Sequence, residues 1–192
     1  MMVVTDGFLR IQQLNVQDAA IWARIYLDNK DFLQPWNPVM GPEFFTVSGQ
    51  TRLLQKASEY WQADRGYGYG IYRNGEPDPV GRVTLSNVVR GAWESCTLGY
   101  WVAKQYNRQG LATGAVRLVS QAAFVSLGLH RIQAAIMPRN RASLTVIKNA
   151  GFEYEGYARH YLKIAGNWED HEIFSLTKED WELYEGNSHS QC

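Results

Sequence analysis

The sequence predicts an α+β protein in which helices flank one central sheet that is mixed, mostly antiparallel and twisted. Three observations support this fold class. Several strand-like apolar runs come first, and a strand–helix–strand–helix–strand–strand order follows them. Between residues 111 and 125, apolar side chains recur at helical spacing, which gives that segment one core face. Near the end of the chain, two strand-like runs flank residues 165–167, which predicts a hairpin.

The first hundred residues are expected to supply four strands and two helices. In order, these are a strand over 8–11, a helix from Asn15, a helix over 51–63, and strands over 67–73, 80–89 and 93–103. Asn15 is a favourable N-cap, and Asp18 follows it in the first turn. Three prolines predict a loop over residues 31–42.

The second half is expected to alternate strands and helices. In order, these are a helix over 111–127 that Gly128 ends, a strand over 131–137, a helix from Asn140 to Gly151, strands over 152–164 and 168–176, and a short helix after Thr177. No linker or repeat interrupts the 192 residues. We therefore expect residues 1–192 to form a single domain, with its core over 8–181 and a flexible C-terminal tail.

Composition and charge argue against several classes of function. Lysine plus arginine and aspartate plus glutamate both number 19, so no global positive field is available to hold nucleic acid. No apolar run approaches the ~20 residues of a membrane span, and residues 1–7 lack a secretory-signal pattern. Cys96 and Cys192 make no disulfide framework, and the four histidines show no metal-ligand spacing. A cytoplasmic protein without a metal is expected.

The most informative stretch is a strand over residues 98–103 that runs through a short polar loop into a helix. Gly110, Ala112 and Gly114 occupy the first turns of that helix. Small residues let a ligand approach the backbone, and the free N–H groups of a helix start favour an anion. The stretch therefore predicts a pyrophosphate site. Neither the phosphate-loop pattern of nucleoside triphosphatases nor the glycine pattern of dinucleotide folds is present.

Two motifs identify a family resemblance. Residues 107–112, Asn-Arg-Gln-Gly-Leu-Ala, resemble the Gln/Arg-x-x-Gly-x-Gly/Ala motif of the GNAT acyl-CoA N-acyltransferases, with Asn107 in place of the usual Gln or Arg. Asn140 and Ser143, followed by Gly151-Phe152, resemble the Asn-x-x-Ser helix of the same family. Segments in the family's order across residues 8–181 resemble the RimJ branch, which acetylates the N-terminal alanine of a small-subunit ribosomal protein. These segments are 32–38, 86–91, 98–100, 130–132, 155–158, 161–162 and 166–171.

The resemblance implies acetyl-CoA as co-substrate, without a metal. It places the pantetheine arm along Tyr100, Trp101 and Val102, and the oxyanion donor near Val102. It places the pyrophosphate at Asn107, Arg108, Gln109, Gly110, Leu111, Ala112 and Thr113. Asn140 would contact the cofactor, and Ser143 would donate a proton or a hydrogen bond to the leaving thiolate. From the residues alone, Asn140 could equally cap a helix whose first turn Ser143 completes.

No residue stands out in the sequence as the general base. An N-terminal amine has a pKa of roughly 7.7–8.0 against roughly 10.4 for lysine, so an α-amine acceptor needs only a weak base or a water chain. Glu94 is one candidate for the base, and a solvent-facing strand carboxylate is the explanation that the sequence favours over it. Asp170 is expected to make strand-end hydrogen bonds, and His171 is left open between that role and orientation of the acceptor. Trp36 and Tyr106 belong either to the acceptor cleft or to the core.

These observations predict direct acetyl transfer to the N-terminal α-amine of a protein, with a basic ribosomal protein as partner. A small amine, such as a polyamine or an amino-sugar, is an alternative acceptor, and a non-catalytic acyl-CoA-binding module is an alternative of another class. Five acidic residues in the predicted hairpin indicate a negative patch that would steer a basic tail: Glu153, Glu155, Glu169, Asp170 and Glu172. The sequence leaves the oligomeric state open.

Overall fold

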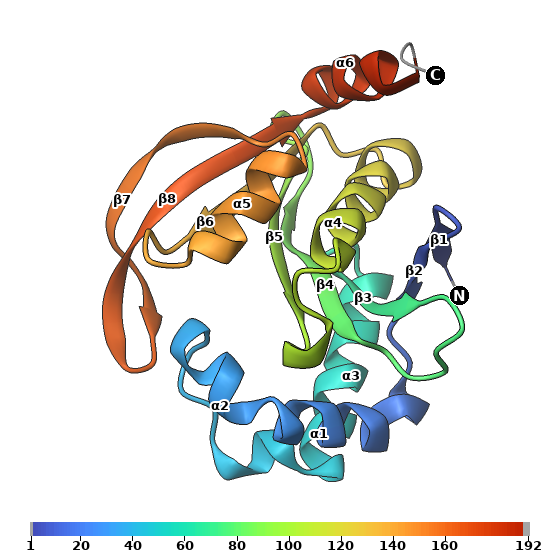
Figure 1. The fold of residues 1–192 in the computed structure, drawn as a ribbon, viewed down its shortest axis with the longest axis vertical. Helices are drawn as coiled ribbons and strands as arrows, with labels where there is room; N and C mark the ends of the chain where they lie inside the picture. Colours follow the sequence, from blue (N-terminus) through green and yellow to red (C-terminus); the bar gives the residue numbers. More distant parts are fainter. Residues whose placement is uncertain (1, 190–192) are drawn as a thin grey trace.

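The computed structural model describes residues 2–189, with side chains up to Tyr184. Within this range eight strands form one open sheet in the order β1-β2-β3-β4-β5-β6-β8-β7 (Figure 1). The strands are β1 Val3–Thr5, β2 Leu9–Gln13, β3 Tyr67–Arg73, β4 Gly81–Val89, β5 Ser95–Val102, β6 Arg131–Ile136, β7 Glu153–Ile164 and β8 Asn167–Thr177. Only β5 and β6 pair in parallel, so the sheet is mixed and mostly antiparallel, as predicted. Of the expected flexible tail after residue 181, the part up to His189 lies in a helix, and residues 190–192, with Cys192, lie outside the described residues.

Helices cover both faces of the sheet. They are α1 Ala19–Asp28, α2 Lys30–Leu33, α3 Val47–Gln62, α4 Leu111–Gln121, α5 Arg141–Asn149 and α6 Lys178–His189. Tyr100 and Trp101 are neighbours on β5, so their side chains point to opposite faces. Trp101 packs on Tyr26 of α1, with ring centroids 4.9 Å apart. Tyr100 Oη instead lies 2.6 Å from Ser143 Oγ of α5. We call the two sides the α1 face and the α5 face; α3 packs beside α1, and α4 beside α5 (Figure 1).

Each face has its own buried cluster. On the α1 face, Trp22, Tyr26 and Leu54 pack together. On the α5 face, α4 buries the residues whose spacing predicted a helix, including Leu111, Ala115 and Leu118. The predicted position of Val125 on this core face is wrong, because its side chain is 65% exposed. Residues Ala122–Ser126 form a π-helical turn, which has one more residue per turn than an α-helix. The extra residue rotates Val125 away from the predicted core face.

The loop expected over residues 31–42 is partly helical. α2 follows α1 directly, and short 3-10 turns occupy Gln34–Trp36 and Pro42–Phe45. Prolines are tolerated in the first turn of a helix, where their missing N–H would have no partner, so they did not exclude these turns. β1 was not predicted either. It is only three residues long and is recognised by its pairing with β2.

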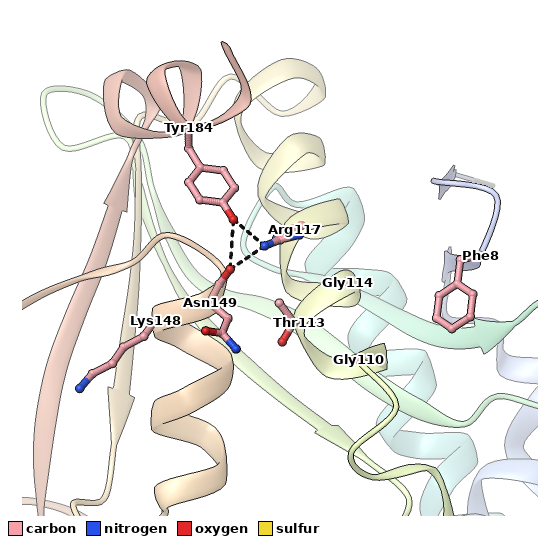
Figure 2. A pocket seen from close by; sticks show the side chains of 8 residues that line it. All are labelled: Phe8, Gly110, Thr113, Gly114, Arg117, Lys148, Asn149 and Tyr184. Atoms are coloured by element: carbon pink, nitrogen blue, oxygen red, sulfur yellow. Dashed lines mark hydrogen bonds between the residues drawn. The ribbon is translucent and has the colours of Figure 1, made fainter. Parts of the chain in front are cut away.

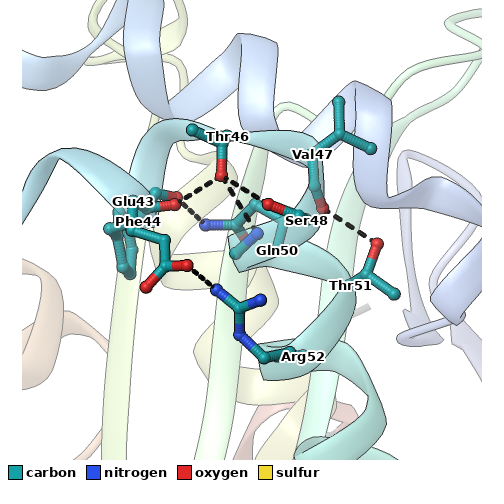
Figure 3. Close-up of polar contacts among 9 residues, drawn as sticks. Glu43, Phe44, Thr46, Val47, Ser48, Gln50, Thr51 and Arg52 are labelled. Carbon is teal, nitrogen blue, oxygen red and sulfur yellow. Dashed lines mark hydrogen bonds and ion pairs between the residues drawn. The ribbon is translucent and has the colours of Figure 1, made fainter.

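α3 begins at Val47 rather than at the expected residue 51, because Thr46 is its N-cap. Thr46 Oγ1 accepts a hydrogen bond from the Gly49 N–H at 3.0 Å (Figure 3). The Gln50 amide donates to the carbonyl of Phe44 at 2.6 Å. Since Gln50 is fully buried, this bond fixes the segment before α3 against the helix. Phe44 of that segment packs on the ring of Tyr26 in α1.

Gly81 allows β4 to approach β5 closely. A Cβ on Gly81 would lie 2.3 Å from the carbonyl oxygen of Trp101, which is backbone and has no rotamer with which to move. We expect Gly81→Ala to lower the free energy of unfolding by about 2 kcal/mol or more, because overpacking forces a backbone shift. Urea denaturation measures this loss. The matched control is Gly156→Ala in β7, where a Cβ meets nothing within 4 Å; an equal loss in both variants would contradict the explanation.

Candidate active site

A cavity of about 680 Å³ opens where β5 and β6 part. Their parallel pairing runs only from Ser95 to Leu98 on β5, opposite Arg131 to Ala134 on β6, although β5 continues to Val102. The cavity passes through the sheet at this split. Its walls on the α5 face are Tyr100, Ala112, Asn140, Ala142, Ser143 and Val146, and those on the α1 face include Tyr26, Phe32, Leu33, Trp36, Trp101, Leu162 and His171.

Backbone polar groups of β5 point into the split. The Ala103 N–H donates to the carbonyl of Val80, the residue before β4, so Ala103 and Val80 form a hydrogen-bonded pair. Alternation along an antiparallel pair then directs the N–H of Trp101 toward β4 and those of Tyr100 and Val102 toward β6. Because the pairing with β6 ends at Leu98, these N–H groups lie beyond the ladder and face the cavity. They are positioned to bond an extended ligand.

The loop before α4 has the geometry of an anion site. Arg108 and Gly110 have φ angles of 62° and 77°, in the left-handed region, and α4 begins at Leu111. The Gly114 N–H makes the first bond of the helix, to Gly110 O at 2.9 Å, so the preceding N–H groups point out of the helix start. A Cβ on Gly110 would meet nothing within 4 Å. The space beside this backbone is therefore open to a ligand.

Gly114 has a different role from the one that its place in the motif indicated. A Cβ there would lie 2.6 Å from Leu9 Cδ2, in the interface between α4 and β2. The residue therefore permits close packing of the helix on the sheet. Asn107 and Ala112 line the cavity, whereas Gln109 extends away from it and bonds the Gln105 carbonyl at 3.1 Å.

A second hollow, also of about 680 Å³, borders the same helix start from the outer side (Figure 2). Gly110, Thr113 and Gly114 form one wall, and Arg117 and Lys148 add two positive charges that sequence reasoning did not single out. Arg117 Nη2 donates to the Asn149 carbonyl at 2.7 Å and lies 2.5 Å from Tyr184 Oη (Figure 2). These bonds tie α4 to the end of α5 and to α6. The only sequence signal was the charge of the two residues, because they are 31 positions apart.

Asn140 and Ser143 lie together at the start of α5. Asn140 Oδ1 accepts a hydrogen bond from the Ser143 N–H at 3.1 Å, so Asn140 is the N-cap. The Ser143 hydroxyl does not take part in this cap. Its Oγ faces the cavity, 2.6 Å from Tyr100 Oη, and the buried position of Tyr100 raises the pKa of that phenol. Tyr100 therefore stays protonated, and its hydroxyl forms a hydrogen bond with the Ser143 hydroxyl.

The structure does not bring Glu94 to the cavity. Glu94 is exposed just before the first residue of β5, and its carbonyl accepts bonds from the His130 and Arg131 N–H groups. At the rise of an extended strand, roughly 26 Å of β5 separate it from Val102 at the split. The prediction that Glu94 is the general base is wrong, because Glu94 lies at the end of β5 opposite the cavity.

Asp170 and His171 diverge although they are neighbours on β8. Asp170 Oδ1 accepts from the His160 N–H at 2.7 Å and Oδ2 from the Tyr157 hydroxyl at 2.7 Å. These bonds hold the bulge of β7 between Ala158 and Leu162, which is the structural role expected for Asp170. They also lower its pKa. His171 points to the opposite face, is 3% exposed and lines the cavity.

The rim on the α1 face joins three distant segments. Trp36 lines the cavity, and Arg139 Cζ lies 5.1 Å above its ring. Arg139 also donates to the Pro35 carbonyl at 3.2 Å and pairs with Glu169 at 3.0 Å. Tyr106, by contrast, bonds Glu76 and does not line the cavity.

The acidic hairpin is less negative than its composition indicates. Glu155 pairs with Arg131, Glu169 pairs with Arg139, and Asp170 is held in the bulge. The pKa of Glu155 is lowered, and its hydrogen bond with the Arg131 guanidinium is the largest cause. Alternation further places Asp170 and Glu172 on the face opposite Glu169. The five residues therefore do not form one uncompensated patch.

The split strands and the open helix start together suit an extended ligand that carries an anionic group. Residues 9–153 match the family model described as an acetyltransferase (GNAT) domain, and the chain belongs to this family. It is 37% identical over 170 residues to the probable N-acetyltransferase YjcK of Bacillus subtilis, covering 88% of this chain and 94% of the relative. It is 34% identical over 182 residues to the [ribosomal protein uS5]-alanine N-acetyltransferase of Escherichia coli, covering 93% and 92%. Mycobacterium smegmatis RimJ in complex with CoA-disulfide superposes with a TM-score of 0.85 at 32% identity, covering 90% of this chain and 83% of that one.

Over residues 2–189, no three or more histidine, cysteine, aspartate or glutamate side chains gather in a way that could hold a metal ion. In the same range no helix has both the length and the apolar character needed to cross a membrane.

Proposed function

We propose that this acetyltransferase transfers the acetyl group of acetyl-CoA to the N-terminal α-amine of a protein, with an alanine-initiated ribosomal protein as its acceptor. The observation that carries the proposal is the cavity through the sheet, because it lets two substrates meet from opposite faces. The names of the Escherichia coli and Mycobacterium smegmatis relatives support the acceptor and the co-substrate.

On the α5 face, the residues present fit acetyl-CoA. The open backbone at Gly110 and the N–H groups of Leu111, Ala112 and Thr113 suit the pyrophosphate. The N–H groups of Tyr100 and Val102 suit the pantetheine arm, and that of Val102 would stabilise the developing oxyanion. Arg117 adds positive charge at the outer end of the same site. A thioester so held would bring its sulfur toward Ser143.

On the α1 face, the walls suit an uncharged amine at the end of a chain. Aromatic and aliphatic side chains such as Phe32, Trp36 and Leu162 surround the opening. Their low polarity disfavours an ammonium and so promotes the neutral, nucleophilic form of the amine. An α-amine reaches this form with little help, because its pKa is roughly 7.7–8.0, against roughly 10.4 for lysine.

A peptide panel tests the proposed acceptor. We expect a peptide that begins with free alanine to be acetylated at its α-amine, with release of one thiol per product. The same peptide with a blocked N-terminus and an internal lysine should react more than two orders of magnitude more slowly, because its neutral amine fraction is roughly 200- to 400-fold smaller near pH 7. Thiol release gives the rates, and mass spectrometry locates the label. Labelling of lysine alone, or a preference for spermidine over every free N-terminus, would contradict the acceptor. No thiol release with any amine would instead favour the binding module.

A further inference from the structure

His171 is a buried titratable group of the cavity to which the proposed transfer gives no role. It is 3% exposed and lies on β8 at the cavity wall. We propose that His171 is the general base of the reaction and takes the proton of the acceptor amine on Nε2. The inference rests on the proposed acetyl transfer and assigns a catalytic residue to the acceptor side of that site.

The sheet register places His171 on the acceptor side. Thr97 pairs with Gln133, and Gln133 pairs with Ser175, so these three side chains share one face. Trp101 is four residues from Thr97, and His171 is four residues from Ser175. Since side chains alternate along a strand, Trp101 and His171 lie on that same face. This is the α1 face, opposite the side where Ser143 and the pyrophosphate loop stand.

A backbone hydrogen bond fixes the tautomer of the ring. His171 Nδ1 lies 3.0 Å from the carbonyl oxygen of Glu169. A carbonyl can only accept, so Nδ1 carries the proton and donates it, and the lone pair of the neutral ring is on Nε2. A base held in one tautomer by a backbone carbonyl has the arrangement that proton abstraction requires.

Burial keeps His171 neutral at physiological pH. Burial is the largest influence and lowers its pKa below the usual 6.5, against the bond to Glu169 and the charges of Glu169 and Asp170. The Glu169 carboxylate is engaged by Arg139, and Asp170 by Tyr157 and His160. From β7, the Tyr161 ring centroid lies 5.5 Å away. The other ionisable side chains on the cavity wall are Tyr26, Arg82 and Tyr100.

The proposed step conserves atoms and charge. The amine nitrogen forms a bond to the thioester carbon, and its excess proton passes to His171 Nε2, which gives an imidazolium. The carbon–sulfur bond breaks, and the thiolate takes a proton from Ser143. The imidazolium then releases its proton to solvent, and Ser143 regains one through Tyr100 or solvent. The net products are an amide and a thiol. A weak base whose pKa lies below that of an ordinary histidine suffices, because the attacking nitrogen becomes much more acidic once the new bond forms.

His171→Asn tests the role without removing the structural bond. The asparagine amide occupies a place similar to Nδ1 and keeps a donor for the Glu169 carbonyl, but it has no base. We expect kcat with an alanine-initiated peptide to fall roughly 100-fold, with the melting temperature and the acetyl-CoA affinity close to those of the wild type. The matched control is His160→Asn on the same hairpin. His160 is exposed, and its φ of 47° suits asparagine, so full activity is expected.

The pH dependence of the wild type tests the proposal independently of any variant. The base works only when neutral, so kcat should fall as the pH drops through a value below 6.5. This acid limb should be absent from the residual activity of His171→Asn. A wild-type kcat that is flat from pH 5 to 8 would overturn the proposal, as would a folded His171→Asn with full kcat. A wild type that acetylates no amine would contradict the proposed function rather than the assignment of His171.

Discussion

Replacing Gly110 by aspartate is expected to weaken acetyl-CoA binding by at least about 100-fold. The residue has a φ of 77° and open space where a Cβ would stand, beside the N–H groups that would hold the pyrophosphate. A carboxylate there faces the phosphates at a few ångströms, where like charges repel by about 4 kcal/mol at 4 Å and an effective dielectric constant of 20. Each 1.4 kcal/mol corresponds to a factor of ten in affinity, so the expected loss is large even if part of the repulsion is relieved.

Isothermal titration with acetyl-CoA measures the change in affinity. Gly110→Ala separates charge from backbone strain, because it introduces the left-handed penalty of about 1 kcal/mol without a charge. Gly91→Asp is the matched control, since Gly91 has a φ of 73°, equally open surroundings and no place at either hollow. Wild-type affinity in Gly110→Asp would show that the pyrophosphate binds elsewhere. Stabilisation of the wild type by millimolar acetyl-CoA in a thermal melt is the accompanying expectation.

Ser143→Ala is expected to lower kcat roughly 100-fold while the affinity for acetyl-CoA stays near that of the wild type. The hydroxyl faces the cavity, and the cap of α5 uses the backbone N–H of Ser143, which alanine retains. Loss of the hydroxyl therefore removes the donor to the leaving thiolate without removing the cap. Stopped-flow detection of the released thiol, compared with the steady-state rate, shows whether the chemical step has slowed.

Two variants sharpen this experiment. Tyr100→Phe removes the hydroxyl that lies 2.6 Å from Ser143 Oγ and should cost roughly tenfold in kcat, which is the effect of one hydrogen bond of ordinary strength. Thr145→Ala removes an exposed hydroxyl from the same helix and should leave kcat unchanged. If Ser143→Ala retains the wild-type kcat, Ser143 has no part in the proton transfer. A joint loss of melting temperature and affinity would show that its role is structural.

The fold class was predictable because its signals are short-range. The strand-like run of β3, the apolar face of α4 and the turn at residues 165–167 are patterns within single elements, and each appears in the structure. The loop proposed to hold the pyrophosphate is local in the same sense. A left-handed glycine followed by small residues at a helix start depends on a few consecutive backbone angles. The N-cap role of Asn140 also depends only on the residues that follow it.

The sequence by itself thus determined the fold class, most of the strands and helices, and the helix that presents Ser143. Only the tertiary structure decided which side chains meet. Tyr100 and Ser143 are 43 residues apart, and Arg139 joins Pro35 to Glu169 across the rim. Glu94 and Val102 share a strand but lie at its two ends, whereas His171 reaches the cavity because strand pairing fixes its face. Contacts between distant segments follow from strand order and register, which are set by the packing of the whole sheet and leave no mark in any short stretch of sequence.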